Sequence, residues 1–351
     1  MDAVNDRRGF MPGKLSQSIG QRFSGNRPNA ATYDVHGVVT KVYADDHLLA
    51  LAVQDFLRPF RGQPDATPDI EFYLLTRDSA ATAPSDYFAA AELLYDWQVL
   101  RYSREGQLRY QEVPGAGSVV ADLDQGIAVA FVESDIAARA WSVTHVIFFP
   151  IWAQLLKTRG VFPVHAAGLE RNGKGIIFPG KSGCGKSTLS LHLLRGGFRL
   201  LGDDTVFVRQ AEGGRAEMLF FPEEVDVCPE TVDLFSQLAL ARNLAEDRWQ
   251  PKQRVNLNAV KSSKVIEAAP VNMLVFPVIA PDGVTRYERV SHTEALAELI
   301  LYAFLFMDPM TSKENFALLA GLVQSTACFR LHMGLDGPAL AGAVDEIVAA
   351  A

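Results

Sequence analysis

The sequence contains few cysteines and no long apolar run. Three of its 351 residues are cysteines, and these three, Cys184, Cys228 and Cys328, lie far apart. So few cysteines exclude a disulfide scaffold, and their spacing is not that of zinc ligands. Both facts suit a reducing cytoplasm, where we expect the protein to act. The longest apolar stretch, residues 143–156, contains Pro150 and is too short to cross a membrane. We therefore expect no contact with a membrane.

An excess of positive charge is also missing. The chain has 33 Lys and Arg residues against 41 Asp and Glu residues, which gives a formal net charge of −8. A general nucleic-acid binder normally shows a basic stripe, so we expect no nucleic-acid partner. Residues 1–31 have no continuous apolar core and are not a secretory signal. Their Gly, Ser, Asn and Arg content predicts a disordered tail.

The composition and length suit two globular domains. Hydrophobic residues make up 48% of the chain and charged residues 21%, and the length is sufficient for two cores. We expect a smaller α+β domain over residues 32–158 and a second domain over residues 159–351. The first domain could position a substrate, mediate assembly or cover the core, and the sequence leaves these roles open. It is also compatible with a homo-oligomer.

A long helical pattern ends the first domain. It covers residues 134–158, with Ser134 as the expected N-cap and Gly160 as the stop, and Pro150 predicts a kink. Apolar alternation and turn residues predict the other elements of this domain. These are strands over 36–43 and 70–75, a helix over 48–60, and hairpins over 99–113 and 119–132.

The second domain opens with a strand, a loop, a helix and a strand. Two apolar strands, 161–169 and 175–178, are joined by a glycine turn. A helix that ends at Gly196 and a further strand, 198–201, follow the loop. Strand, helix and strand at this spacing form a crossover unit. We therefore expect an α/β domain whose sheet is at least partly parallel.

The loop between the strand and the helix has the pattern of a phosphate-binding loop (P-loop, or Walker A motif). Residues 180–187 read GKSGCGKS and match G-x-x-x-x-G-K-[ST] in full. The three glycines allow positive φ, so that backbone N–H groups can turn toward one anion at the positive end of the helix dipole. The pattern predicts a bound nucleoside triphosphate, with Lys186 on its phosphates and Ser187 on Mg²⁺. The expected binding residues are Gly180, Lys181, Ser182, Gly183, Cys184, Gly185, Lys186, Ser187 and Thr188.

Two acidic residues and a histidine are candidates for the chemistry. Asp203 and Asp204 follow an apolar strand, at the edge where α/β proteins place ligands if that strand lies beside the loop strand. One acid could hold Mg²⁺ and the other accept a hydroxyl proton. His165 could supply a pH-dependent charge near the terminal phosphate, since its strand can neighbour the loop strand. A tight turn and a core histidine are the alternatives without function.

Later charged residues carry weaker signals. Lys252 and Arg254 share one face of an extended segment and could contact phosphate oxygens, or they could form a solvated edge. Glu223 and Glu224 could add a metal ligand, although a solvated pair is favoured.

With these motifs in register, the chain resembles a known family. The segment VFPVHAAGLERNGKGIIFPGKSGCGKSTLSLHLLRGGFRLLGDDTVFV is similar to the catalytic core of the HPr kinase/phosphorylase superfamily. It looks closer still to the HPr-kinase-related proteins that include peptide-modifying serine kinases. The segments KQRVNLN, VNMLVFPVIAPDG and CFRLHMGLDG extend the resemblance over about residues 160–340.

The resemblance implies a fold, cofactors and an activity. The fold would be the mixed-sheet P-loop kinase domain shared with phosphoenolpyruvate carboxykinases, and the cofactors would be ATP and Mg²⁺. The implied activity is phosphorylation of a serine hydroxyl. Asp203 matches the family's catalytic base, Asp204 its acidic neighbour and His165 its phosphate-proximal histidine. We therefore expect Asp203, Lys186 and His165 to be catalytic. Ser187 and Asp204 are expected to hold Mg²⁺. The family signature E-I-R-G-L-G-I is missing after the Asp pair, which argues against HPr as the acceptor and against the reverse phosphorylase reaction.

We expect an ATP-dependent kinase that phosphorylates a serine of a peptide or protein. A kinase of a small hydroxylated metabolite and a non-catalytic ATP-sensing or scaffold module are the alternatives. The acids and His165 argue against simple sensing, because binding alone needs no base. A GTPase or a transporter ATPase is disfavoured, because neither N-K-x-D nor L-S-G-G-Q is present and residues 201–203 make a poor Walker B strand.

Overall fold

The computed structural model describes residues 29–77, 91–97, 99–211, 213–221, 225–227, 243–244, 253–255, 265–303, 308–334 and 336–351. The chain divides into two compact units, Met1–Arg159 and Gly160–Ala351. The sequence placed a domain boundary between residues 158 and 159. Among the described residues, no helix is long and apolar enough to span a membrane.

The first unit is built on one mixed sheet of eight strands. Its strands are β1 (Asn29–Val35), β2 (Val38–Ala44), β3 (Ile70–Arg77), β4 (Glu92–Asp96), β5 (Arg101–Glu105), β6 (Leu108–Val113), β7 (Gly117–Asp122) and β8 (Ile127–Glu133). Their order in the sheet is β1-β2-β3-β8-β7-β6-β5-β4. β3 runs parallel to both β2 and β8, and the other neighbours are antiparallel.

The two predicted hairpins are confirmed as β5–β6 and β7–β8. The expected tail extends too far, because its last three residues, 29–31, belong to β1. β1 pairs along its whole length with β2, from Asn29 opposite Ala44 to Val35 opposite Val38. This strand was missed because its own sequence, NAATYDV, has little apolar alternation, and long-range pairing stabilises it instead.

The helices of the first unit differ in part from the prediction. The first, α2 (His47–Phe56), is capped by the Asp46 carboxylate, which accepts from the Leu48 backbone N–H at 2.7 Å, and the short helix η1 (Arg58–Phe60) follows it. The helix predicted over 134–158 starts later, as a π-helical segment, η3 (Ser142–Phe148), that continues into α3 (Phe149–Lys157).

The predicted cap of that helix is wrong. The Ser134 hydroxyl donates to the Arg77 carbonyl at 3.3 Å and caps no helix. Pro150 lies in the first turn of α3, where its missing N–H breaks no hydrogen bond of that helix. The chain changes from π-helical to α-helical geometry there. These helices pack on the sheet, since Phe148 contacts Phe72 and the Trp152 indole donates to the Thr40 hydroxyl at 3.1 Å.

The second unit is also built on a mixed sheet of eight strands. Its strands are β9 (Phe162–Arg171), β10 (Lys174–Pro179), β11 (Arg199–Gly202), β12 (Thr205–Gln210), β13 (Ala216–Leu219), β17 (Ala268–Ile279), β18 (Arg286–Arg289) and β19 (Ala327–Met333). The main order is β10-β9-β12-β13-β17-β19-β18, with β11 also paired to β9 and β17 also paired to β10. A separate small sheet has the order β14-β16-β15 and comprises β14 (Val225–Val227), β15 (Asn243–Leu244) and β16 (Gln253–Val255).

The sheet is partly parallel, as the sequence predicts. β10, β17 and β19 are parallel neighbours. β11 does not lie beside β10, because β9 lies between them and pairs antiparallel with both. β10 and β11 therefore still run in the same direction, as their connecting helix requires.

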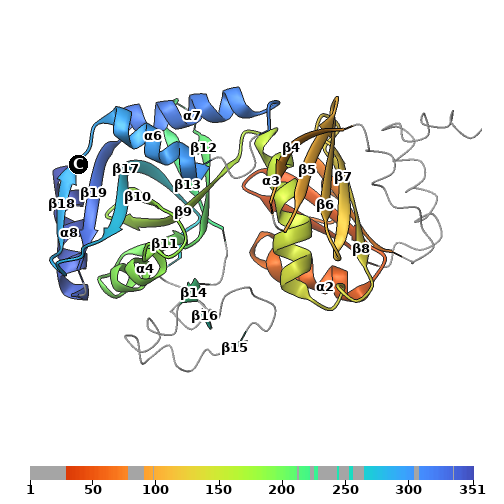
Figure 1. Ribbon diagram of the computed structural model, residues 1–351, viewed down its shortest axis with the longest axis horizontal. Helices are drawn as coiled ribbons and strands as arrows, with labels where there is room; N and C mark the ends of the chain where they lie inside the picture. Colours follow the sequence, from red (N-terminus) through yellow and green to blue (C-terminus); the bar gives the residue numbers. More distant parts are fainter. Residues whose placement is uncertain are drawn as a thin grey trace, which may run out of the picture. The chain divides into compact units, whose positions relative to one another are not determined.

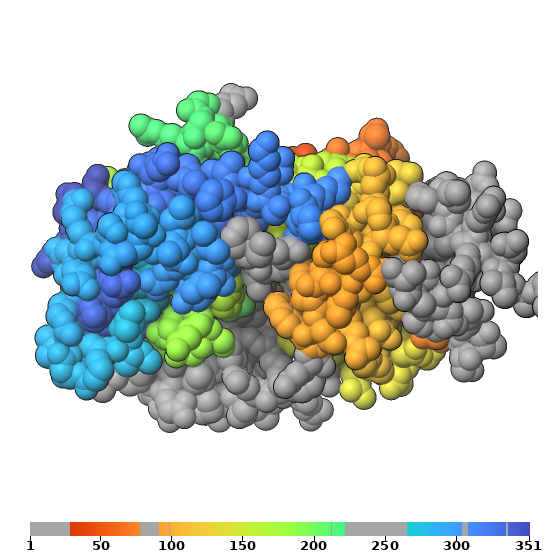
Figure 2. Space-filling view, turned by 45° about the horizontal axis from the view of Figure 1, so that its top comes forward, coloured from red at the N-terminus to blue at the C-terminus, as the bar shows by residue number. Residues whose placement is uncertain are grey.

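Helices cover both faces of this sheet (Figure 1). They are α4 (Lys186–Arg195), α6 (His292–Ala303), α7 (Ser312–Ser325) and α8 (Gly337–Ala350). One apolar core joins α4 and α8 to the sheet, and a second joins α6 and α7 to its other face. In the space-filling view, residues in the blue shades of 265–351 cover most of the visible face of this unit (Figure 2).

Candidate functional site

The glycine loop lies at the carboxyl end of β10, directly before α4. Gly183 and Gly185 have positive φ, 82° and 93°, as the sequence predicts. Gly180 does not, so the expectation of a left-handed conformation there is wrong. A side chain at position 180 would instead collide with the Cys184 thiol, since a Cβ there would lie 2.6 Å from Sγ. Close packing inside the loop, and not backbone conformation, requires this glycine.

Lys186 is the first residue of α4 and is buried inside the loop. Its side chain is 5% exposed. Its ammonium donates to the carbonyls of Gly180 at 2.6 Å and Lys181 at 3.2 Å, and its Nζ lies 3.1 Å from His165 Nε2. The loop carbonyls thus hold a positive charge at the centre of the turn.

His165 connects this lysine to one of the acids. It projects from β9, and its Nδ1 lies 3.4 Å from Asp204 Oδ2. A lysine ammonium can only donate, so His165 Nε2 accepts and the ring proton lies on Nδ1, toward the carboxylate. Asp204, His165 and Lys186 form a continuous polar chain.

The two acids have different environments. The Asp204 side chain is 56% exposed, whereas Asp203 is 1% exposed. Burial raises the pKa of Asp203, although the hydrogen bond from the Ser187 hydroxyl and the nearby Ser190 hydroxyl oppose this shift. Ser190 Oγ itself has no partner in hydrogen-bonding geometry. Asp203 is therefore a shielded carboxyl group, and Asp204 is an accessible one.

Asp203 and Ser187 can provide oxygen ligands for a cation. Asp203 Oδ1 is fully buried and has no hydrogen-bond partner in the structure, which is costly for a carboxylate oxygen unless a cation or proton satisfies it. Mg²⁺ prefers such oxygens and is usually bound by one or two carboxylates together with phosphate and water oxygens. Among the described residues, no three His, Cys, Asp or Glu side chains form a complete metal cage. The available residues fit this partial kind of magnesium site.

The structure brings most of the expected residues to one edge of the sheet. Residues 180–188, His165, Asp203 and Asp204 all lie there. Lys252, Glu223 and Glu224 fall outside the described residues. Arg254 belongs to β16, but its side chain is outside the description, so its predicted phosphate contact stays a prediction.

Sequence reasoning missed two residues near the loop. Ser190 lies three residues after Ser187 on α4, on the same side of the helix, and this spacing was an available signal. Tyr302 comes from α6, and its hydroxyl accepts from the Lys181 backbone N–H. No motif marks Tyr302, because only the packing of α6 brings it to the loop.

Comparisons with known proteins give limited similarities. No protein-family model matches the chain. A protein named HPr kinase/phosphorylase, from Geobacillus sp. (strain WCH70), is 43% identical over 51 residues, which are 14% of this chain and 16% of that protein. The chain thus aligns with about one sixth of that relative.

A solved structure gives a second similarity. It is the HPr(Ser) kinase/phosphatase from Coxiella burnetii, with 14% sequence identity and a TM-score of 0.28. The match covers 54% of this chain and 97% of that chain. A superposition at this level carries no argument about the site. The 51-residue identity supports the HPr kinase/phosphorylase resemblance at the coarse level of the family.

Proposed function

We propose that this chain is an ATP-dependent kinase that transfers the γ-phosphate of Mg·ATP to a hydroxyl, most readily a serine of a peptide or protein. One observation carries this proposal. A chain of contacts from Asp204 through His165 to Lys186, and the neighbouring pair Asp203 and Ser187, meet at the glycine loop. A module that only binds a nucleotide has no need of an accessible carboxylate beside its loop.

The geometry favours a division of roles opposite to the one expected from the family match. Asp204 is accessible to an incoming hydroxyl, and His165 holds its carboxylate in place. In the proposal, Asp204 therefore accepts the proton of the acceptor hydroxyl. Asp203, which is 1% exposed, holds the Ser187 hydroxyl in this proposal.

Charge stabilisation comes from the loop in this proposal. Lys186 provides a fixed positive charge, and the backbone N–H groups at the start of α4 add the positive end of the helix dipole. Ser187 and Asp203 would hold Mg²⁺, which neutralises charge on the phosphates when bound. In the proposal, His165 keeps Lys186 and Asp204 oriented through its contacts with both side chains.

Phosphate transfer from γ-labelled ATP tests this function. The purified chain would be incubated with Mg·ATP and either serine-containing peptides and proteins or small hydroxylated metabolites. The Lys186→Ala variant serves as the inactive control. We expect label on a peptide or protein serine, detected by its mass shift. Label found only on metabolites would show that the acceptor is a small hydroxylated metabolite and not a peptide or protein. ATP binding without transfer to any acceptor would favour the sensing module.

A further inference from the structure

The side of the loop opposite to the acids has no role in the proposed chemistry. The same residues of β10 pair with β9 along one edge and with β17 along the other. β19 pairs with β17, and both run parallel to β10, so these three strands end at the edge that carries the loop. His165 lies on the β9 side. The ends of β17 and β19 lie on the other side.

The ends of these two strands contact the loop and present apolar groups. A Cβ built at Gly185 would lie 2.9 Å from Met333 Cε, at the end of β19. Ile279, the last residue of β17, is paired with Met333 in the sheet. Alternation along β17 places Ile279 on the α4 side together with Met273 and Val275, which belong to the core of α4 and α8. Unlike them, Ile279 is 57% exposed.

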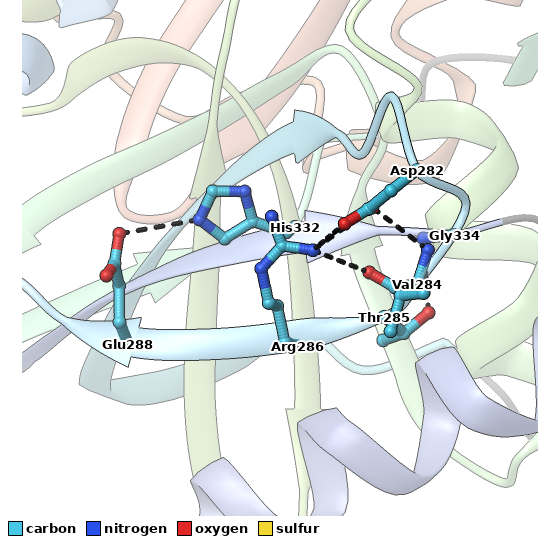
Figure 3. A network of polar contacts seen from close by, with 7 residues as sticks. All are labelled: Asp282, Val284, Thr285, Arg286, Glu288, His332 and Gly334. Atoms are coloured by element: carbon cyan, nitrogen blue, oxygen red, sulfur yellow. Dashed lines mark hydrogen bonds and ion pairs between the residues drawn. The ribbon is translucent and has the colours of Figure 1, made fainter.

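The turn that follows Ile279 is fixed by several hydrogen bonds. The Arg286 guanidinium donates to the Asp282 carboxylate at 2.8 Å and to the Val284 carbonyl at 3.3 Å (Figure 3). The Gly334 backbone N–H, just beyond β19, donates to the Thr285 hydroxyl at 3.1 Å. This turn is therefore tied both to itself and to the end of β19. Val284 is nevertheless 57% exposed.

We propose that Ile279 and Val284 form the nucleoside subsite of this site and contact the base of the bound nucleoside triphosphate. The inference rests on the proposed function, because that function places the terminal phosphate beside Asp204 and His165. The rest of the nucleotide then extends to the opposite side of the loop, over β17 and β19. Neighbouring strands are about 5 Å apart, so the end of β19 lies about 10 Å from the loop strand.

The chemistry of this surface suits a flat heterocycle with a polar sugar. Binding sites for such ligands combine apolar contacts with a few fixed polar groups. Ile279 and Val284 provide the apolar contacts, and the Asp282 and Arg286 pair provides donors and acceptors already fixed in position. A preorganised surface loses little conformational entropy when a ligand binds.

Calorimetry with two probes, Mg·ATP and Mg·tripolyphosphate, tests the subsite. Tripolyphosphate carries the phosphates without a nucleoside. We expect Ile279→Asp to weaken ATP binding by about tenfold, because it replaces an apolar contact by a charge that repels the nucleotide. Tripolyphosphate affinity should change less than ATP affinity. Val278→Asp is the matched control, since Val278 is also exposed (38%) but alternates to the opposite face of β17.

The outcomes separate this inference from the proposed function. Unchanged ATP affinity in Ile279→Asp, or an equal loss for both probes, would overturn the subsite while leaving the phosphate loop intact. Equal affinity of the unmodified chain for ATP and tripolyphosphate would also overturn the subsite, because the nucleoside would then add nothing to binding. If neither probe binds the unmodified chain, the proposed function fails and the subsite fails with it. Because Ile279 and Val278 are exposed, neither substitution should prevent folding, and circular dichroism checks this.

Discussion

Arg109 and Asp122, two buried charged side chains of the first unit, contact their own turns, whereas the buried Lys186 of the second unit also contacts a residue far away in the chain. In the first unit, Arg109 donates to the Gly106 and Leu108 carbonyls, and Asp122 accepts from the backbone N–H groups of residues 124 and 125. These contacts stabilise the turns of two hairpins. In the second unit, Lys186 is in contact with His165, which lies 21 residues earlier in the chain.

The difference indicates where the chemistry lies. A charged side chain that contacts the backbone groups of its own turn stabilises that turn. A fully buried carboxyl with a raised pKa and an unpartnered oxygen, such as Asp203, reduces stability and persists where function needs it. The second unit therefore contains the candidate site, and the first unit shows no comparable cluster among its described residues.

The largest expected effect comes from removing the accessible carboxylate of the site. Asp204→Asn should lower phosphate transfer by about 10²- to 10⁴-fold, the usual contribution of a general base, with little change in ATP affinity. Asp203→Asn should instead raise the Mg²⁺ concentration required for transfer. Initial rates measured over a series of Mg²⁺ concentrations distinguish the two variants.

Asp345→Asn is the matched control for this prediction. Asp345 lies on α8 in the same unit, is also partly exposed, and forms an ion pair with Arg171 at 3.2 Å. Its variant should transfer phosphate at the unmodified rate. If Asp204→Asn behaves like Asp345→Asn while Asp203→Asn loses transfer at every Mg²⁺ concentration, Asp203 is the base, as the family match implies.

The next largest effect concerns the buried lysine of the loop. Lys186→Ala should weaken ATP and tripolyphosphate binding by about 100-fold, because it removes a charge-assisted contact with phosphate oxygens, and should leave adenosine binding unchanged. Lys174→Ala is the control, since Lys174 belongs to β10 and donates to the Val348 carbonyl at 2.9 Å. Equal losses for all three ligands, measured by calorimetry, would show damage to the fold instead of a lost phosphate contact.

Local patterns in the sequence predicted much of both units. The hairpins β5–β6 and β7–β8 and the strand, loop and helix around residues 180–187 follow from turn residues and apolar alternation. β1 and the late start of the helix before residue 158 were missed, because pairing with β2 and packing on the sheet override local propensity there.

The residue types of the candidate site could be predicted, but their division of roles could not. The motif spacing selected His165, Asp203 and Asp204, and the structure places all three near Lys186. The burial of Asp203 and the exposure of Asp204 depend on tertiary packing, which two adjacent identical residues do not reveal. The same holds for Tyr302, which reaches the loop from a distant helix. That these residues bind a nucleotide stays a prediction.

A smaller effect tests whether the first unit takes any part in ATP binding. Gly126 has a φ of 72°, and a Cβ there would collide with the Asp69 carbonyl, whereas Gly106 has a φ of 59° and open space around it. Gly126→Ala should lower the free energy of unfolding by about 2 kcal/mol and Gly106→Ala by about 1 kcal/mol. Chemical denaturation measures both. Neither should change ATP affinity, and a loss in both variants would assign the first unit a part in binding.

The smallest expected effect is a gain in stability from neutralising the buried acid. Burial raises the pKa of Asp203 above its ordinary value of 3.8, so the native state binds its proton more tightly than the unfolded state does. The stabilisation from this group is fully present below the ordinary pKa and is lost as the pH rises through the raised one. At neutral pH, the buried Asp203 therefore lowers the free energy of unfolding unless a cation compensates its charge.

Asp203→Asn removes this ionisation while keeping the size of the side chain. We expect the Tm of the second unit to rise at neutral pH by about 2–4 °C, the shift that roughly 1 kcal/mol produces in a domain of this size. The gain should disappear as the pH falls toward the ordinary carboxyl pKa, where Asp203 is protonated in both states. Thermal unfolding without Mg²⁺ or nucleotide, recorded across this pH range, provides the measurement. A variant that is less stable than the unmodified chain at every pH would show that the ionised Asp203 stabilises the fold. The contrast between the buried carboxyl group of Asp203 and the turn-bound Arg109 and Asp122 of the first unit would then be wrong.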